Sequence, residues 1–195
     1  MARPRKDSAE QPVKERIKNA FWKLYETRPL EQIGVKEICN AARCNKTTFY
    51  YHYTCTTQVL EEIEGECLLL DLPKFLVELL GKDVFDTQAI ARYVQKNGAR
   101  IETIRALLGP NGDPSFKQAM EEKLIECWCE AMGIRQEDLE PDDRLFLRYS
   151  MGGTIGLVAH DPARGDEPLD FEALYRLAAD LILPRVKRMI SHYDK

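Results

Sequence analysis

One short segment of the chain, residues 46–53 (KTTFYYHY), combines basic, hydroxyl-bearing and aromatic side chains. On a helix of about 3.6 residues per turn, Phe49 and Tyr53 share one face. The opposite face carries the hydroxyl groups of Thr47, Thr48 and Tyr51. Lys46 lies at the start of the helix, and Tyr50 and His52 lie at the edges of this face. Such groups contact phosphates and base edges in the DNA major groove. The segment therefore predicts a DNA-recognition helix, with an ordinary solvated face as the alternative.

Cysteine and histidine residues suggest no other site. The six cysteines are Cys39, Cys44, Cys55, Cys67, Cys127 and Cys129. Their spacing, with His160 as the nearest histidine to the last pair, does not match a zinc site, and disulfides are not expected in a reducing compartment. We expect Cys39, Cys44 and Cys67 on apolar helix faces, and we expect Cys55, in an exposed turn, to be the reactive thiol.

No nucleophile and base, glycine-rich phosphate loop or metal-ligand set emerges from the remaining residues. We expect a protein that is not an enzyme and that needs no metal or cofactor.

Composition indicates a folded protein rather than a disordered or membrane-spanning one. The 195 residues are 44% hydrophobic and 31% charged, which is ordinary for a globular chain. No stretch reaches the roughly 18 apolar residues that a membrane helix needs. The basic start is not followed by the apolar run of a signal peptide, so we expect a cytoplasmic location without membrane association.

Charge is distributed unevenly along the chain. Residues 1–60 hold 11 lysine and arginine residues against 6 acidic ones, whereas the remainder holds 17 against 26. A positive first segment suits a polyanionic partner, and chance clustering is the alternative.

The elements that must position residues 46–53 are helices. Apolar residues from Val13 to Tyr25 recur at helical spacing, and Pro29 ends this helix. A second helix covers residues 35–42, a turn follows at residues 43–44, and Asn45 is a suitable N-cap for the third. Three helices in about forty residues, with a tight second turn, predict a helix-turn-helix.

Helical periodicity continues to the end of the chain, so we expect an all-α protein with no strands. The last two helices are expected near residues 142–160 and 169–193. Gly152, Gly153 and Gly156 interrupt the first of them, which predicts either close helix approach across a two-fold axis or a break in the helix.

Two blocks resemble the TetR/AcrR family of transcription regulators. Residues 35–42 (VKEICNAA), residues 43–53 (RCNKTTFYYHY) and Val59-Leu60 match its DNA-binding block. Residues 107–116 (LLGPNGDPSF) resemble the C-terminal domain of a Gram-positive subset. The resemblance implies a homodimer through the last two helices and an effector pocket in the C-terminal core. The expected domains are then residues 1–55, a helix-turn-helix with a basic arm, and residues 56–195, for effector binding and dimerisation.

The resemblance also implies roles for single residues. Lys46, Thr47 and Tyr51 would face bases, and Thr48, Tyr50 and His52 would contact phosphates. The candidate DNA contacts further include Arg3, Arg5, Lys6 and Lys36, of which the first three form an arm that either reaches DNA or is a solubilising tail. Thr56 and Gly34 depart from the family pattern, which has lysine and Thr or Ser there, and both changes weaken phosphate anchoring.

Aromatic and methionine residues in the C-terminal part are candidates for binding an apolar or aromatic effector: Tyr93, Phe116, Met120, Trp128, Phe146 and Tyr149. Plain core packing is the alternative for each. The sequence thus predicts a ligand-responsive repressor that binds double-stranded DNA at a pseudo-palindromic operator as a dimer. The alternative is a non-DNA-binding helical dimer that acts as a co-regulator by docking on a partner protein.

Overall fold

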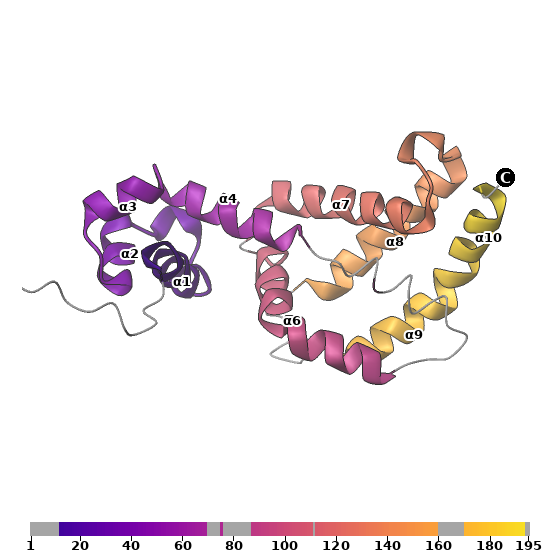
Figure 1. Cartoon of the computed structure of the whole chain (residues 1–195), viewed down its shortest axis with the longest axis horizontal. Helices are drawn as coiled ribbons and strands as arrows, with labels where there is room; N and C mark the ends of the chain where they lie inside the picture. Colours follow the sequence, from indigo (N-terminus) through magenta and orange to yellow (C-terminus); the bar gives the residue numbers. More distant parts are fainter. Residues whose placement is uncertain (1–11, 70–74, 76–86, 111, 160–169, 194–195) are drawn as a thin grey trace, which may run out of the picture. The chain divides into compact units, whose positions relative to one another are not determined.

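A computed structural model describes residues 12–69, 75, 87–110, 112–159 and 170–193. Every regular element in these ranges is a helix, which confirms the all-α class (Figure 1). The chain divides into two compact units, residues 1–65 and 66–195. The sequence placed the boundary at 55/56. The difference arises from α4 (Thr56–Cys67), where Glu62 forms ion pairs with Lys14 and Lys18 of the first helix.

The first unit contains α1 (Val13–Tyr25), η1 (Leu30–Gln32), α2 (Val35–Ala42), α3 (Lys46–His52) and most of α4. α1 ends ahead of Pro29, as predicted. Its fully buried Ile17 and Phe21 belong to a core to which the other helices contribute Ile38, Phe49 and Val59. The Arg16 Nε–H donates to the Ala42 carbonyl at 3.1 Å and so connects α1 with the end of α2. Trp22 is half-buried, and its indole N–H donates to Glu26 at 3.0 Å.

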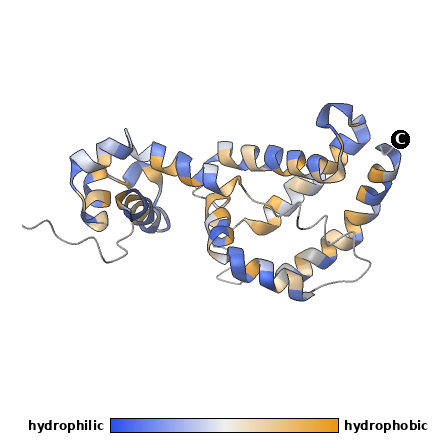
Figure 2. Ribbon diagram, in the orientation of Figure 1, coloured by the Kyte–Doolittle hydropathy of each residue, from blue (hydrophilic) through white to orange (hydrophobic). Residues whose placement is uncertain are grey.

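The second unit contains α6 (Thr87–Leu107), α7 (Pro114–Met132), η2 (Gln136–Asp138), α8 (Pro141–Val158), α9 (Phe171–Leu181) and α10 (Leu183–Tyr193). One cluster of buried side chains, which we call the Trp128 cluster, joins α7, α8 and α10 and includes Trp128, which is 4% exposed. α7 begins with an Asp113 N-cap that accepts from the Ser115 N–H, and it ends at Gly133 with a φ of 70°. Figure 2 shows hydrophobic and hydrophilic residues interspersed along these helices, as amphipathic elements require.

Two details of the last helices differ from expectation. The single helix expected over residues 169–193 is wrong, because Ile182 interrupts it and separates α9 from α10. Pro184 supplies the reason, since proline has no N–H and its ring clashes with the carbonyl four residues earlier. The alternative of a break at the glycines is also wrong, because α8 continues through Gly152, Gly153 and Gly156.

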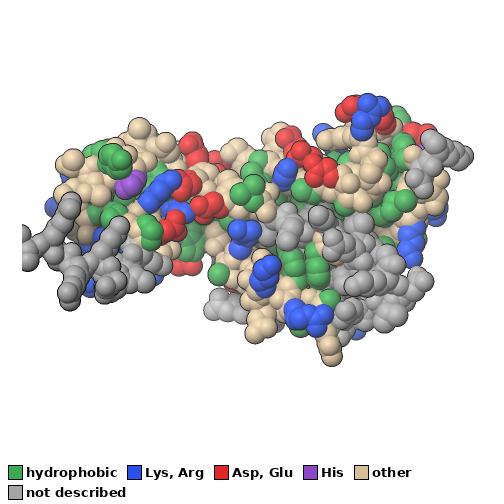
Figure 3. Space-filling model, in the orientation of Figure 1, with side chains coloured by type: hydrophobic (Ala, Val, Ile, Leu, Met, Phe, Trp, Pro, Cys, Tyr) green, Lys and Arg blue, Asp and Glu red, His purple; other side chains and the backbone are tan. Residues whose placement is uncertain are grey.

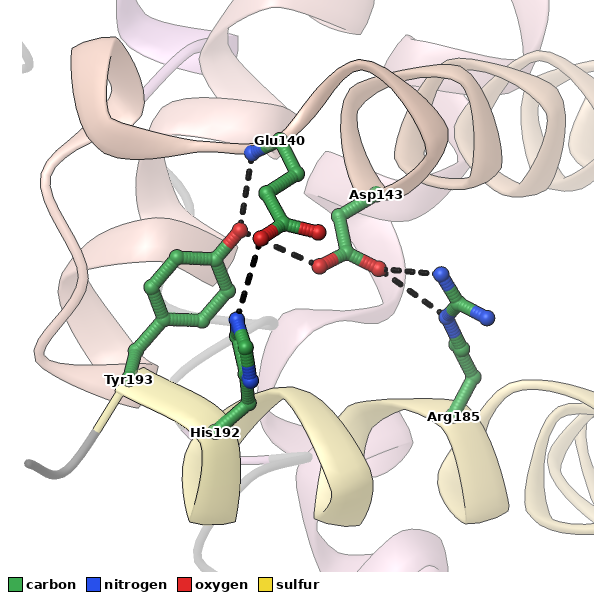
Figure 4. A network of polar contacts seen from close by, with 5 residues as sticks. All are labelled: Glu140, Asp143, Arg185, His192 and Tyr193. Atoms are coloured by element: carbon green, nitrogen blue, oxygen red, sulfur yellow. Dashed lines mark hydrogen bonds and ion pairs between the residues drawn. The ribbon is translucent and has the colours of Figure 1, made fainter.

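A buried carboxylate fixes the start of α8 against α10 (Figure 4). Asp143 is 4% exposed and accepts from the Arg185 guanidinium at 3.0 and 2.5 Å. The Tyr193 hydroxyl donates to Asp143 at 3.1 Å and accepts from the Glu140 N–H at 2.8 Å. The exposed His192 ring lies 3.2 Å from the Glu140 carboxylate. We call Asp143, Arg185 and Tyr193 the Asp143 clamp.

No helix in the described part of the chain combines the length and the apolar character needed to cross a membrane.

Candidate nucleic-acid interface

The turn between α2 and α3 is tight and has an unusual backbone. Arg43 is in the left-handed region with a φ of 53°, the one described non-glycine residue with a positive φ. Its N–H donates to the Asn40 carbonyl, and the Cys44 N–H donates to Cys39 at 3.0 Å. These bonds close the end of α2 and allow α3 to begin within three residues. The predicted turn at residues 43–44 is therefore confirmed.

Asn45 caps α3, as the sequence predicts. Its side-chain oxygen accepts from the Thr48 N–H at 2.7 Å and from the Thr48 hydroxyl at 2.9 Å. A hydroxyl has one proton to donate. Because Thr48 gives that proton to Asn45, its oxygen is left as an acceptor and cannot also donate to a phosphate in this arrangement.

The faces of α3 are divided as the helical wheel predicts. Phe49 and Tyr53 are 0% and 2% exposed, whereas Tyr51 is 84% exposed. Tyr50 is 55% exposed, and its ring meets that of Phe49 edge to face with centroids 5.5 Å apart. The remaining candidates on this helix are Lys46 and Thr47, both exposed, and Thr48 and His52, both half-buried.

Tyr51 has an aromatic neighbour that limits its movement. The rings of Tyr51 and His52 meet edge to face with centroids 5.0 Å apart. The Tyr51 phenol thus projects from the surface while its ring is supported from one side. A large side chain held in this way can reach into a groove with less loss of conformational entropy than a free one.

Behind α3, charged groups connect α1 with α4. Glu62 lies 2.6 Å from the Lys14 ammonium and 3.5 Å from that of Lys18, and Lys18 also pairs with Glu15 at 2.9 Å. The Lys14 ammonium is 5.5 Å from the centre of the Tyr53 ring. Burial raises the pKa of Tyr53 well above its usual range, and the nearby Glu62 charge acts in the same direction. Tyr53, the last residue on the inward-packing face, is thus held neutral.

The entry to α4 is fixed by a side chain of its own first turn. The Gln58 side-chain oxygen accepts from the Thr54 N–H at 2.7 Å and from the Thr54 hydroxyl at 3.2 Å. Cys55 is exposed here, and hydrogen bonds from the Gln58 backbone and from the Thr54 side chain lower the pKa of its thiol. Thr56, which stands where the resembled family has lysine, is half-buried.

The other expected DNA contacts are placed as follows. Lys36 is exposed in the first turn of α2, which begins after Gly34. The Gly34 N–H donates to the Glu37 carboxylate at 3.2 Å, so Glu37 closes this helix start without a Ser or Thr side chain. Arg3, Arg5 and Lys6 lie outside the described residues.

Sequence reasoning missed one cation near this surface. Arg43 is exposed in the turn that precedes α3. Its left-handed conformation has no clear sequence signal, because glycine and asparagine are the usual residues at such a position.

Most of the expected effector residues lie inside the second unit. Tyr93, Phe116, Met120 and Trp128 are at most 9% exposed. Phe146 is half-buried against the Trp128 cluster, and the Tyr93 ring stacks on Phe75 with centroids 4.4 Å apart. Tyr149 is 82% exposed on α8 and so belongs to the surface rather than to this interior set.

Cys39 on α2 and Cys67 on α4 are buried, as predicted. The expectation of an apolar helix face is wrong for Cys44, which is partly buried in the turn between α2 and α3. Among the residues that the structure describes, no three His, Cys, Asp or Glu side chains are grouped so that they could hold a metal ion.

Comparisons with known proteins add no neighbour: no protein-family model matches the chain, and neither the curated proteins nor the solved structures give a match.

Proposed function

We propose that this chain is a cytoplasmic DNA-binding transcription regulator of the TetR/AcrR kind, a ligand-responsive repressor that binds a pseudo-palindromic operator as a homodimer. The observation that supports this most is the division of α3. Phe49 and Tyr53 anchor the helix, while Lys46, Thr47 and Tyr51 are free of the core. A solvated helix gains nothing from an 84% exposed tyrosine, whereas a major groove offers it base edges and phosphates.

The chemistry of binding follows from the groups on α3. The Lys46 ammonium and the Tyr51 phenol can donate to base acceptors, and the Thr47 methyl group can contact a thymine methyl. Lys36 and Arg43 supply further cations for phosphates. Thr48 would contribute only after exchanging its bond to Asn45 for one to DNA.

Fluorescence anisotropy with the intergenic DNA beside the gene tests this function. Tyr51→Ala and Lys46→Ala should each weaken binding by about 5- to 150-fold, the effect of one lost base contact. Lys117→Ala, an exposed lysine of the second unit, is the matched control and should bind normally. Unchanged affinity in both α3 variants would contradict the assignment.

Salt dependence separates this function from protein docking. Neutralising Z phosphates gives a slope of about −0.9Z in log K against log salt concentration. A co-regulator that only docks on a protein would show no such slope with promoter DNA.

An exposed apolar face supports the homodimer. On α8, Leu145 is 68%, Tyr149 82% and Leu157 43% exposed, and on α9, Leu177 and Leu181 are 46% and 65% exposed. Burying such a face against a second copy removes it from water. A side-chain carbon added at Gly152, Gly153 or Gly156 would meet nothing within 4 Å. No contact within the described chain therefore explains these glycines, and close approach by a second copy does.

Sedimentation should give the mass of a dimer at micromolar concentration. Gly153→Leu should dissociate it, because the added side chain occupies the space that the partner helix needs. Gly98→Leu on α6 is the matched control, since that glycine also lies within a helix with open space around it. A wild-type monomer, or equal effects of the two substitutions, would contradict the proposed interface.

The interior aromatic set supports an apolar effector. Phe116, Met120 and Trp128 on α7 are large and adaptable side chains, and with Phe146 they offer contact to an apolar or aromatic ligand. α4 begins four residues after the end of α3 and continues to the first residues of the second unit. A ligand that shifts α4 would change the separation of the two recognition helices, which must match a DNA turn of about 34–36 Å.

Linkage provides the test of this regulation. A coupling that lowers DNA affinity about 5- to 150-fold must lower ligand affinity by the same factor when DNA is bound. Compounds that raise the melting temperature are titrated with and without DNA. Identical ligand affinities in the two titrations would contradict the proposed regulation.

A further inference from the structure

α6 carries a row of basic side chains with a regular spacing. Arg92, Lys96 and Arg100 are four residues apart and all exposed, so they lie on one face at intervals of about 6 Å. No acidic residue occurs three or four positions from Lys96 or Arg100. The one acidic residue of the helix, Glu102, pairs with Arg105 at 3.1 Å. Figure 3 shows lysine and arginine side chains following α6.

The arrangement is unusual for a chain with surplus acidic residues. Like charges four residues apart on a helix repel each other and lower its stability. The exposed positions beside the row are Ala91, Gln95 and Ala99, which are small or neutral. Another helix can therefore approach the row without a steric or charge barrier.

α7 carries the complementary row. Glu122, Glu126 and Glu130 are exposed with the same four-residue spacing. Lys123 pairs with Glu126 at 2.7 Å, which leaves a net negative charge on this face. We call Arg92, Lys96 and Arg100 the basic row and Glu122, Glu126 and Glu130 the acidic row.

We propose that the basic row of one copy of this chain binds the acidic row of another copy. Equal spacing and opposite charge select this partner. Since the two rows lie on different helices, each copy offers both halves of the contact. The contact is separate from the apolar face of α8 and needs no DNA.

The strength of this contact follows from its exposure. Each exposed ion pair multiplies an association constant by roughly 1.4- to 5-fold, so the two pairs that Lys96 and Arg100 form contribute about 2- to 25-fold, and salt screens them. The association is thus weak and salt-sensitive, and it raises the mass above that of any species formed through α8.

Sedimentation of the full chain over a range of concentrations, at low and at high salt, tests the proposal. At low salt the average mass should rise with concentration, and high salt should reverse the rise. The basic-reversed variant, Lys96→Glu with Arg100→Glu, should lose this association. The acid-reversed variant, Glu126→Lys with Glu130→Lys, should lose it as well. Lys23→Glu with Arg188→Glu makes the same charge change at exposed sites elsewhere and should behave as the wild type.

Mixing the two reversed variants gives the decisive result. Each then carries the rows that complement the other, so an equimolar mixture should recover the salt-sensitive association that each variant alone has lost. Circular dichroism verifies that both variants are folded. An average mass that changes neither with salt nor with charge reversal would overturn the proposal. A mixture of the two variants that does not associate would overturn it as well. Loss of affinity for a non-specific DNA duplex in the basic-reversed variant alone would assign the row to nucleic acid instead.

Discussion

Cys55 is the one exposed thiol among the six cysteines. Hydrogen bonds from the Gln58 backbone and the Thr54 side chain lower its pKa, whereas burial raises the pKa of Cys44, Cys127 and Cys129. Because the thiolate is the reactive form, Cys55 should be alkylated first at neutral pH. Mass spectrometry after brief treatment with iodoacetamide should find the label there. Cys55→Ser should remove the fast phase and Cys44→Ser should keep it; label spread over several cysteines would contradict the expectation.

Arg43 carries backbone strain next to the recognition helix. A non-glycine residue with a φ of 53° costs about 1 kcal/mol relative to glycine. Arg43→Gly should therefore raise the free energy of unfolding by up to about 1 kcal/mol in urea denaturation, while weakening DNA binding through the lost cation. Arg43→Ala removes the same cation without relieving the strain, so its stability should not rise. Equal stabilities of the two variants would show that the backbone is unstrained.

Single residues also show where sequence reasoning ends. The helical wheel predicts correctly that Phe49 and Tyr53 point inward, because period and burial are properties of the pattern. It does not reveal that the Thr48 hydroxyl donates to Asn45, since a cap depends on side-chain geometry. The sequence predicts Tyr149 as an effector-binding residue because aromatic side chains are common in cores. The structure shows it exposed on α8.

Among the elements, α8 and α10 depend on the Asp143 clamp. Asp143→Asn should destabilise the second unit by about 1–3 kcal/mol, because the Arg185 charge loses its carboxylate partner. Tyr193→Phe should cost about 1–2 kcal/mol through two lost hydrogen bonds. His192→Ala, at the exposed pair with Glu140, is the control and should have little effect. Chemical denaturation measures all three; equal stability of the Asp143 and His192 variants would contradict a structural role for the clamp.

Helix boundaries were predictable where a residue dictates them. Asn45 marks the start of α3, and Gly133 ends α7. The division between α9 and α10 also had a signal, Pro184, but the apolar periodicity across it suggested one helix. The continuity of α8 through its glycines could not be read from propensity, because a cost of up to about 1 kcal/mol for each glycine is small beside the energy of packing.

At the scale of whole units, acid should weaken the first unit through Glu62 and Glu37. Burial favours a higher pKa for Glu62, but Lys14 and Lys18 outweigh it, and the pKa lies below the usual 4.5. The hydrogen bond from Arg28 and that from the Gly34 backbone lower the pKa of Glu37. Carboxylates with lowered pKa values in the folded state stabilise it above the unfolded-state pKa, and this stabilisation is lost as the pH falls through the folded-state values.

Glu62→Gln should therefore reduce stability at neutral pH and flatten the acid limb of the melting temperature against pH. The exposed neighbour Glu61→Gln is the control and should keep the wild-type profile. Identical acid limbs in the two variants would contradict a role for the Glu62 ion pairs.

The placement of the two tryptophans has a spectroscopic consequence. Trp22 is half-buried on α1 of the first unit, while Trp128 lies in the apolar cluster of the second. An indole surrounded by hydrocarbon emits at shorter wavelength than one near water, so the emission band should contain a blue component from Trp128 and a red component from Trp22. Each compact unit thus carries its own fluorophore. With Trp22→Phe the remaining fluorescence intensity reports only on the second unit. The unfolding of the two units can then be measured separately without an attached dye.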